Sequence, residues 1–421
     1  MTTTKELIIR ANRVERVRTL CGDSSEPARC QTLRRYQRMI LWKCRELLPP
    51  LLKHTDVPAR ITESFILSGY RFPNYSVVQC LVSAFRPTNE TGNFWTHFLP
   101  VFVFGFYFAE PFGWENSVPA NDPFFYPLWT YFIGVFCLLM ASSMAHLLNS
   151  MSLVVREVCF FVDYGTISAY TVGSSLAYRY YIHPGAGIPE TSAGGHNDSR
   201  EQPSLSSSLP TAPEFSVFFE TFYIPSSCLV AVICVLACCN TRQRWRTYRY
   251  VIRTLVFLMP FLVASTPIFY RLLYASPHLP GSTSSFPTAG FFYWHCFWLV
   301  ASAVFNISKV PERLSPGRFD IWGHSHQWFH VCTFLSILEE LHMITGEVRA
   351  ILLHPTLVVP PASPRHLPSP SAASTYGVML LLQASIASII AWFSYCAKGI
   401  HQPQAGQQGK EVLAIRHLKC H

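Results

Sequence analysis

Apolar residues gather in eight long stretches along this chain, separated by polar or Pro- and Ser-rich segments. Each stretch is close to the ~20 residues that an α-helix needs to cross the hydrocarbon core of a membrane. Neither a βαβ pattern nor a series of strands is evident. The stretches lie at 94–111, 126–148, 157–181, 216–239, 254–274, 288–308, 328–348 and 376–397. The pattern predicts an all-α, multi-pass membrane helical bundle of eight helices.

The segments between the stretches suggest how the chain is divided. Residues 183–214 are rich in Pro, Ser and Gly and cannot support a hydrophobic core, so we interpret them as a flexible loop. A similar segment separates the seventh and eighth stretches. The predicted parts are a basic amino-terminal region (1–92), a seven-helix transmembrane core (93–353), a Pro/Ser loop (354–375), the eighth transmembrane helix (376–397) and a tail (398–421).

Lysine and arginine residues predict the orientation. Residues 1–92 contain fifteen of them, 112–125 contain none, and 241–253 contain five Arg. Because cytoplasmic loops of membrane proteins are enriched in these residues, the alternation places both termini in the cytoplasm. We interpret the Arg run at 241–253 as an anchor to anionic headgroups, with a docking surface for a cytoplasmic partner as the alternative. A short loop between membrane helices makes nucleic acid an unsuitable partner.

Composition supports the membrane interpretation. Half of the 421 residues are hydrophobic and 14% are charged, whereas soluble domains carry about 25% charged residues. Residues 1–60 lack the apolar segment of a secretory signal. The fourteen cysteines include no CxxC pair, and most lie in apolar stretches or in the basic amino-terminal region. We therefore expect buried or reduced thiols rather than disulfides.

Three histidines stand out in "GHSHQWFHV", residues 323–331, at the start of the seventh stretch. On a helix, His326 and His330 are four residues apart and share one face, a spacing at which two imidazoles can hold one metal ion. Alone this is a weak signal. The predicted topology strengthens it, because His146 ends the second stretch at the same face of the bilayer.

Two further polar residues fall in the same layer of the membrane. Ser142 lies one helical turn before His146, and Asp163 lies one to two turns into the third stretch. Three histidines near a carboxylate suit Zn²⁺ with one coordination position left for water. Asp163 would then orient or deprotonate that water, and Ser142 would support the site by a hydrogen bond. The alternative is an interhelical hydrogen-bond cluster without metal.

Two other polar residues, His324 and Glu340, are not expected to bind the metal. We expect His324 to be a loop or interface residue rather than a fourth ligand. Glu340 shares the face of His326 but lies some 20 Å further along the helix. It would either line a polar spot in a central cavity or lie with Glu339 at a fraying outer end, and we favour the second interpretation.

Four segments resemble signature segments of the progestin and adipoQ receptor family, in the same order. They are "NETGNFWTHFLP" (89–100), "SSMAH" (142–146), "DYG" (163–165) and "GHSHQWFHV" (323–331). The resemblance extends from about Asp56 to the end of the seventh stretch. The eighth stretch fits the progestin-receptor branch, and the segments 63–73 and 306–327 resemble one subtype of that branch.

The resemblance implies roles for individual residues. His146, His326 and His330 correspond to the zinc-binding histidines of the family, while Asp163 and Ser142 correspond to its associated acid and serine. The implied function is a plasma-membrane steroid receptor that binds a progestin or neurosteroid and gives rapid, non-genomic signals through heterotrimeric G proteins. Residence in the endoplasmic reticulum is the alternative location. Zinc would then be structural.

A different function remains open for the same residues. A zinc-dependent lipid amide hydrolase, similar to alkaline ceramidases, would use Asp163 as the general base. An ordinary heptahelical G-protein-coupled receptor is excluded, because no DRY follows the third stretch and no NPxxY occurs. The chain has four N-x-S/T sequons, at Asn74, Asn89, Asn197 and Asn306. With the amino terminus inside, only Asn197 would face the glycosylation machinery.

Overall fold

The computed structural model describes residues 48–114, 118–183, 217–243, 249–274, 286–353 and 369–401. Within these ranges the regular structure is helical, and β-type pairing is limited to an isolated bridge between Leu52 and Tyr70. The predicted all-α membrane bundle is therefore confirmed. The predictions for residues 1–47, 184–214, 354–368 and 402–421 lie outside the described residues, as do the sequon at Asn197 and the middle of the Arg run.

Every stretch predicted to cross the membrane contains at least one helix. The long helices are α4 (Thr91–Ala109), α5 (Tyr126–Leu148), α6 (Leu153–Ala177), α8 (Tyr223–Gln243), α9 (Arg249–Ala264), α10 (Thr266–Tyr274), α11 (Ala289–Ser308), α12 (Ser325–Leu353) and α13 (Val378–His401). Shorter elements are α3 (Val77–Ser83), the 3₁₀ turns η1 (His54–Asp56), η2 (Glu110–Gly113) and η3 (Pro123–Phe125), and the π-helical turns η4 (Tyr178–Ile182), η5 (Phe218–Phe222) and η7 (Ala373–Gly377).

The helices differ in how apolar they are. In the described part of the chain, four segments are long and apolar enough to cross a membrane: Pro123–Leu148, Phe218–Gln243, Ala289–Ser308 and Ala373–His401. The α9–α10 pair, bent by 53°, would make a fifth. Helices α4, α6 and α12 have 19, 25 and 29 residues but carry polar side chains. Because polar residues in membrane helices face the bundle interior, these three helices are expected to carry the functional site. The total of eight crossings stays a prediction.

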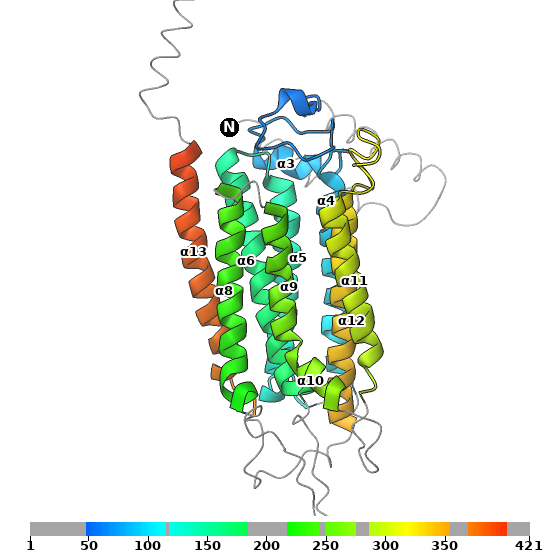
Figure 1. The fold of residues 1–421 in the computed structure, drawn as a ribbon, viewed down its shortest axis with the longest axis vertical. Coiled ribbons are helices and arrows are strands. Elements are labelled where there is room, and N and C mark those ends of the chain that lie inside the picture. Colours follow the sequence, from blue (N-terminus) through cyan, green and yellow to red (C-terminus); the bar gives the residue numbers. More distant parts are fainter. Residues whose placement is uncertain are drawn as a thin grey trace, which may run out of the picture. The chain divides into compact units, whose positions relative to one another are not determined.

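The beginning and the end of the membrane bundle lie at the same end of it (Figure 1). A hydrogen bond of 3.2 Å joins Arg60 Nη1 to His401 Nε2 at the end of α13. This arrangement agrees with an even number of crossings. The prediction that this end faces the cytoplasm rests on the charge pattern and stays a prediction.

Helices α5 and α6 approach closely at two glycines. A Cβ atom at Gly134 would lie 3.0 Å from the Cα of Tyr170, and one at Gly173 would lie 3.1 Å from the carbonyl oxygen of Thr130. Larger residues at either position would push the helices apart, because interiors are close-packed. The contact fixes the depth at which α6 places Asp163 next to α5.

The outward faces of the helices are apolar. Large hydrophobic side chains that are more than half exposed include Phe106 on α4, Leu229 on α8, Val300 on α11 and Leu381 on α13. Such extensive exposed apolar surface is rare on monomeric soluble proteins. It is the surface expected of helices that contact lipid.

Candidate metal centre

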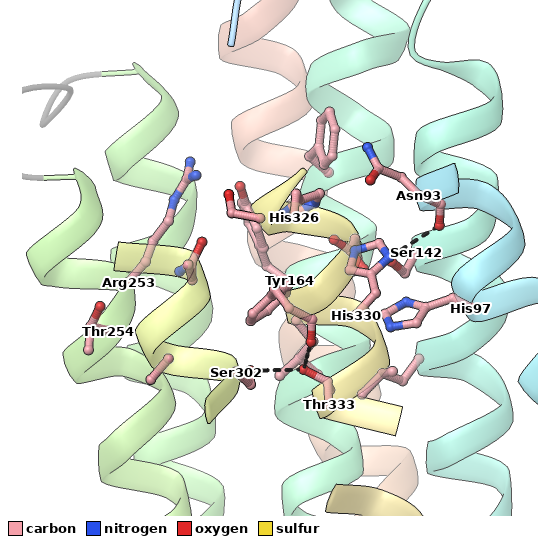
Figure 2. Close-up of a pocket in the computed structure, with 18 of the residues that line it drawn as sticks. Asn93, His97, Ser142, Tyr164, Arg253, Thr254, Ser302, His326, His330 and Thr333 are labelled. Atoms are coloured by element: carbon pink, nitrogen blue, oxygen red, sulfur yellow. Dashed lines mark hydrogen bonds between the residues drawn. The ribbon is translucent and has the colours of Figure 1, made fainter. Parts of the chain in front are cut away.

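Three histidines from two helices meet at the end of the bundle where α5 ends and α12 begins. His146 lies in the last turn of α5, and His326 and His330 lie in the first two turns of α12. One ligand nitrogen from each histidine lies within 4.8 Å of the other two. Figure 2 shows His326 and His330 on the same face of α12. The structure thus brings together the three histidines that the sequence singled out.

Hydrogen bonds orient two of the imidazole rings. His146 Nδ1 lies 2.7 Å from Glu90 Oε2, and His330 Nδ1 lies 3.1 Å from the carbonyl oxygen of Asn93 and 3.0 Å from Thr96 Oγ1. A carboxylate or carbonyl partner requires the proton on Nδ1, which leaves a lone pair on Nε2. This is the usual arrangement of metal-ligating histidines.

The spacing of the nitrogens fits a zinc ion. Two nitrogens that are each about 2.0–2.1 Å from a tetrahedral Zn²⁺ lie roughly 3.4 Å apart. His146 Nε2 and His326 Nε2 lie 3.3 Å apart. The donor atoms and the separation of this pair therefore suit Zn²⁺, and the presence of the ion stays a prediction.

Glu90 is the main residue of this centre that sequence reasoning missed. It is 8% exposed and accepts hydrogen bonds from Asn149 Nδ2 at 2.7 Å and Asn93 Nδ2 at 2.9 Å, in addition to its contact with His146. Arg156 Nη1 lies 3.9 Å away. An acid directly before a long apolar stretch, in "NETGN", was the available signal. Its partner in space could not be identified without the fold.

A buried arginine holds the end of α5 in place. Arg71 donates hydrogen bonds to the carbonyl oxygens of His146 at 2.6 Å and Leu147 at 2.7 Å, to Asn149 Oδ1 at 2.6 Å and to Ser83 Oγ at 3.0 Å. The last carbonyls of a helix have no intrahelical donor, and a basic side chain at that position satisfies them. Arg71 therefore fixes the turn that carries His146.

The start of α12 is held in a similar way by an acid. Glu312 accepts hydrogen bonds from the backbone N–H of Ser325, at 2.7 Å, and from its hydroxyl group. The preceding residue, His324, lies with Nε2 3.1 Å from the carbonyl oxygen of Asn89. Burial lowers the pKa of His324, which favours the neutral imidazole. Among the described residues, His324 is not part of the group of possible ligands, and its role stays a prediction.

Asp163 and Ser142 lie beside the histidines without joining them. Both side chains are buried, they are hydrogen-bonding neighbours, and both line the same cavity as His146. The carboxylate of Asp163 is not part of the group of atoms within 4.8 Å. The arrangement is compatible with the predicted supporting role, which stays a prediction.

A cavity of ≈ 490 Å³ extends from the histidines into the bundle. Its size falls within the ~300–1,000 Å³ of typical small-molecule sites. Helix α12 lines it with one face, which is mostly polar and includes two apolar side chains, Phe329 and Ile337. The residues of this face are His326, Phe329, His330, Thr333, Ser336, Ile337 and Glu340. Thr254 on α9 and Ser302 on α11 also border the cavity, and Ser302 lies 3.1 Å from Thr333 of α12 (Figure 2).

The favoured interpretation of Glu340 was wrong. Helix α12 continues to Leu353, so Glu340 lies well inside it and is 1% exposed. Its carboxyl oxygens accept hydrogen bonds from the hydroxyl groups of Tyr170 and Tyr178, and Tyr131 Oη lies 3.3 Å from Oε2. The alternative that we had considered, a polar spot in a central cavity, is the one that the structure supports.

His97 is a second polar residue of the cavity that sequence reasoning missed. Its ring stacks on that of His330, with centroids 3.8 Å apart and an angle of 11° between the planes. It is 3% exposed, and among the described residues neither of its ring nitrogens has a hydrogen-bond partner. Figure 2 shows it reaching from α4 towards His330.

Comparison with known proteins yields two kinds of similarity. A family model described as haemolysin-III related matches residues 85–340, which include Glu90, the three histidines and Glu340. The chain is 32% identical to human membrane progestin receptor gamma over 74% of its own length and 83% of that protein. It is also 32% identical to human membrane progestin receptor delta over 72% and 80% of the respective lengths, and to mouse membrane progestin receptor gamma over 85% and 97%.

Proposed function

This chain belongs to the haemolysin-III-related family and, within it, to the branch of the membrane progestin receptors, and we propose that it is a membrane receptor for a progestin or a related steroid. The resemblance based on sequence segments is thus confirmed for the family and the branch. The assignment to one subtype stays a prediction. The chain is a multi-pass membrane protein, and we place it in the plasma membrane as part of the proposal.

The cavity next to the histidines is the observation that carries this proposal. Its volume of ≈ 490 Å³ suits a small, largely apolar molecule. Phe261 on α9, Leu299 on α11 and Leu138 on α5 contribute apolar walls. A steroid would reach this space from the lipid, because its bordering helices also present exposed apolar residues such as Val300 to the membrane.

In this proposal the histidines hold Zn²⁺ as a structural element. The ion would join the last turn of α5 to the first turns of α12, and would supply positive charge and Lewis acidity at one end of the cavity. Ligand binding would then shift α5 and α12 relative to each other and so change the cytoplasmic surface of the bundle. Heterotrimeric G proteins are the proposed partners of that surface.

Steroid binding to purified protein tests the receptor proposal. Labelled progesterone should bind saturably to the full chain in lipid nanodiscs, and should be displaced by unlabelled pregnane steroids. Leu299→Trp, which fills the cavity, should abolish binding, whereas Leu229→Trp on the lipid face of α8 should leave it unchanged. Equal binding to both variants would contradict the proposal.

A hydrolase is the second candidate, and the position of Asp163 favours it. The carboxylate lines the cavity next to His146 and Ser142. It is placed to take a proton from water that adds to a lipid amide carbonyl. The amine would leave with a proton and the fatty acid would remain, as expected for ceramide hydrolysis.

Product analysis distinguishes the two functions. Release of sphingosine from ceramide by the purified protein, lost in Asp163→Asn with zinc content unchanged, would establish the hydrolase. Saturable progesterone binding that survives Asp163→Asn, without product, would establish the receptor.

A further inference from the structure

The cavity has two polar ends: the histidines lie at one, and Glu340 lies at the other, far from them. His330 and Glu340 both line it from α12 and are ten residues apart, which corresponds to about 15 Å along a helix at 1.5 Å per residue. The cavity is therefore elongated parallel to α12. A ligand that fills it meets imidazoles at one end and the Glu340 carboxyl group at the other.

The hydrogen bonds of Glu340 leave it with acceptor capacity. A carboxylate offers about four acceptor positions on its two oxygens. The hydroxyl groups of Tyr170 and Tyr178 occupy two of them. Tyr131 contributes a longer contact and also donates to the carbonyl oxygen of Ile337 at 3.1 Å. At least one acceptor position is therefore available to a hydrogen-bond donor inside the cavity.

Ser265 provides a second, independent indication of a ligand at this end. It lies at the break between α9 and α10, is 1% exposed and lines the cavity, and its hydroxyl group has no hydrogen-bond partner among the described residues. The neighbouring residue, Ala264, accepts a hydrogen bond from the hydroxyl group of Tyr223 at 2.6 Å. Ala264 also belongs to the same buried cluster as Tyr178, Ile337 and Leu341, which flank Glu340. Leaving a buried hydroxyl group unsatisfied costs free energy, which a bound polar group would recover.

We propose that Glu340, oriented by Tyr170 and Tyr178, and Ser265 bind a hydroxyl group at one end of an elongated apolar ligand whose other end lies against the histidine centre. A hydroxyl group both donates and accepts, so it can donate to Glu340 while it accepts from Ser265. A ketone at the same position has no proton to offer the carboxylate. The site therefore selects a hydroxylated ligand over its ketone counterpart. This inference rests on the proposed receptor function.

Two matched pairs of pregnane steroids test the site with the full chain in nanodiscs. The members of one pair differ only in a ketone or a hydroxyl group at the A-ring end, and those of the other pair differ in the same way at the side-chain end. The wild-type protein should bind the hydroxyl member of one pair about tenfold more tightly, as expected for one additional well-formed hydrogen bond. Glu340→Gln should reduce this preference to within about twofold, because the amide can also donate to a ketone.

Two further variants separate recognition from folding. Glu339→Gln makes the same change at the neighbouring position, which does not line the cavity, and should keep the preference. Ser265→Ala removes a hydroxyl group that has no hydrogen-bond partner in the part of the chain that the structure describes. Folding should therefore be retained while the hydroxyl ligand binds several-fold more weakly.

The outcomes are distinguishable. Wild-type protein that binds neither pair would overturn the receptor function and this site together. Wild-type protein that binds both members of each pair equally would overturn the site alone. A preference that survives Glu340→Gln, or unchanged affinity in Ser265→Ala, would also overturn the site alone.

Discussion

Glu90 and His146, 56 residues apart in the sequence, meet in the interior of the bundle through a contact of 2.7 Å between Oε2 and Nδ1. Because the carboxylate binds Nδ1, the ring presents Nε2 to His326. Two asparagines complete the hydrogen bonding of the carboxylate. Glu90 therefore orients the His146 ring, and would position it for the proposed metal ion.

Glu90→Gln should weaken zinc binding by about 10–100-fold, as expected when a supporting carboxylate is lost. The amide retains the size of the side chain but no longer holds the Nδ1 proton as strongly. Zinc affinity is measured by competition with a chromogenic chelator. Glu63→Gln is the matched control, because Glu63 also contacts Arg156, at 3.4 Å, but is about half exposed. An equal loss of affinity in both variants would refute a specific role for Glu90.

His330→Ala should reduce the zinc content of the purified protein from about one ion per chain to near zero, since three nitrogen ligands are the usual minimum for a stable site. Elemental analysis measures the content. His342→Ala, on the same helix near Tyr107, should retain the metal. A chelator should lower the Tm of the wild-type protein and of His342→Ala but not of His330→Ala. Near-zero zinc in every protein would remove the metal hypothesis.

Arg71→Met should destabilise the protein by about 2–5 kcal/mol, because the buried carbonyls of His146 and Leu147 would lose a charged donor. Zinc retention should fall with it, since the last turn of α5 carries a ligand. Arg71→Lys should recover part of the stability. The loss of stability is measured as the fraction of folded protein that size-exclusion chromatography detects after heating to increasing temperatures. Arg60→Met is the control, because the contact of Arg60 with His401 is only partly buried. A Tm unchanged in Arg71→Met would show that the cap is dispensable.

Glycosylation tests the orientation. Asn74 is exposed in the amino-terminal segment, whereas Asn89 is buried and its carbonyl oxygen is bonded to His324. With that end in the cytoplasm, a glycan is expected at Asn197 alone, and Asn197→Gln should abolish the mobility shift caused by a glycosidase. Asn74→Gln serves as the control that should change nothing. A glycan at Asn74 would reverse the orientation and place the histidines near the outer face.

The sequence by itself determined where the helices lie and which three histidines come together. Apolar stretches of membrane length predicted the helix positions, since burial in lipid requires a long run of apolar residues. The spacing of His326 and His330 predicted their shared face, because residues four positions apart lie about one helical turn from each other. His146 could be added from topology alone, since the ends of neighbouring helices lie in the same layer.

Only the tertiary structure decided which polar groups meet. Glu90, His97 and Glu340 each lie in or beside a helix that gives no local indication of its rotation relative to its neighbours. Glu340 was assigned to a fraying end, but α12 continues past it and three tyrosines from other helices surround its carboxyl group. Periodicity is a local property of the chain, whereas partners and burial depend on how helices pack. For that reason the histidines were predictable and the far end of the cavity was not.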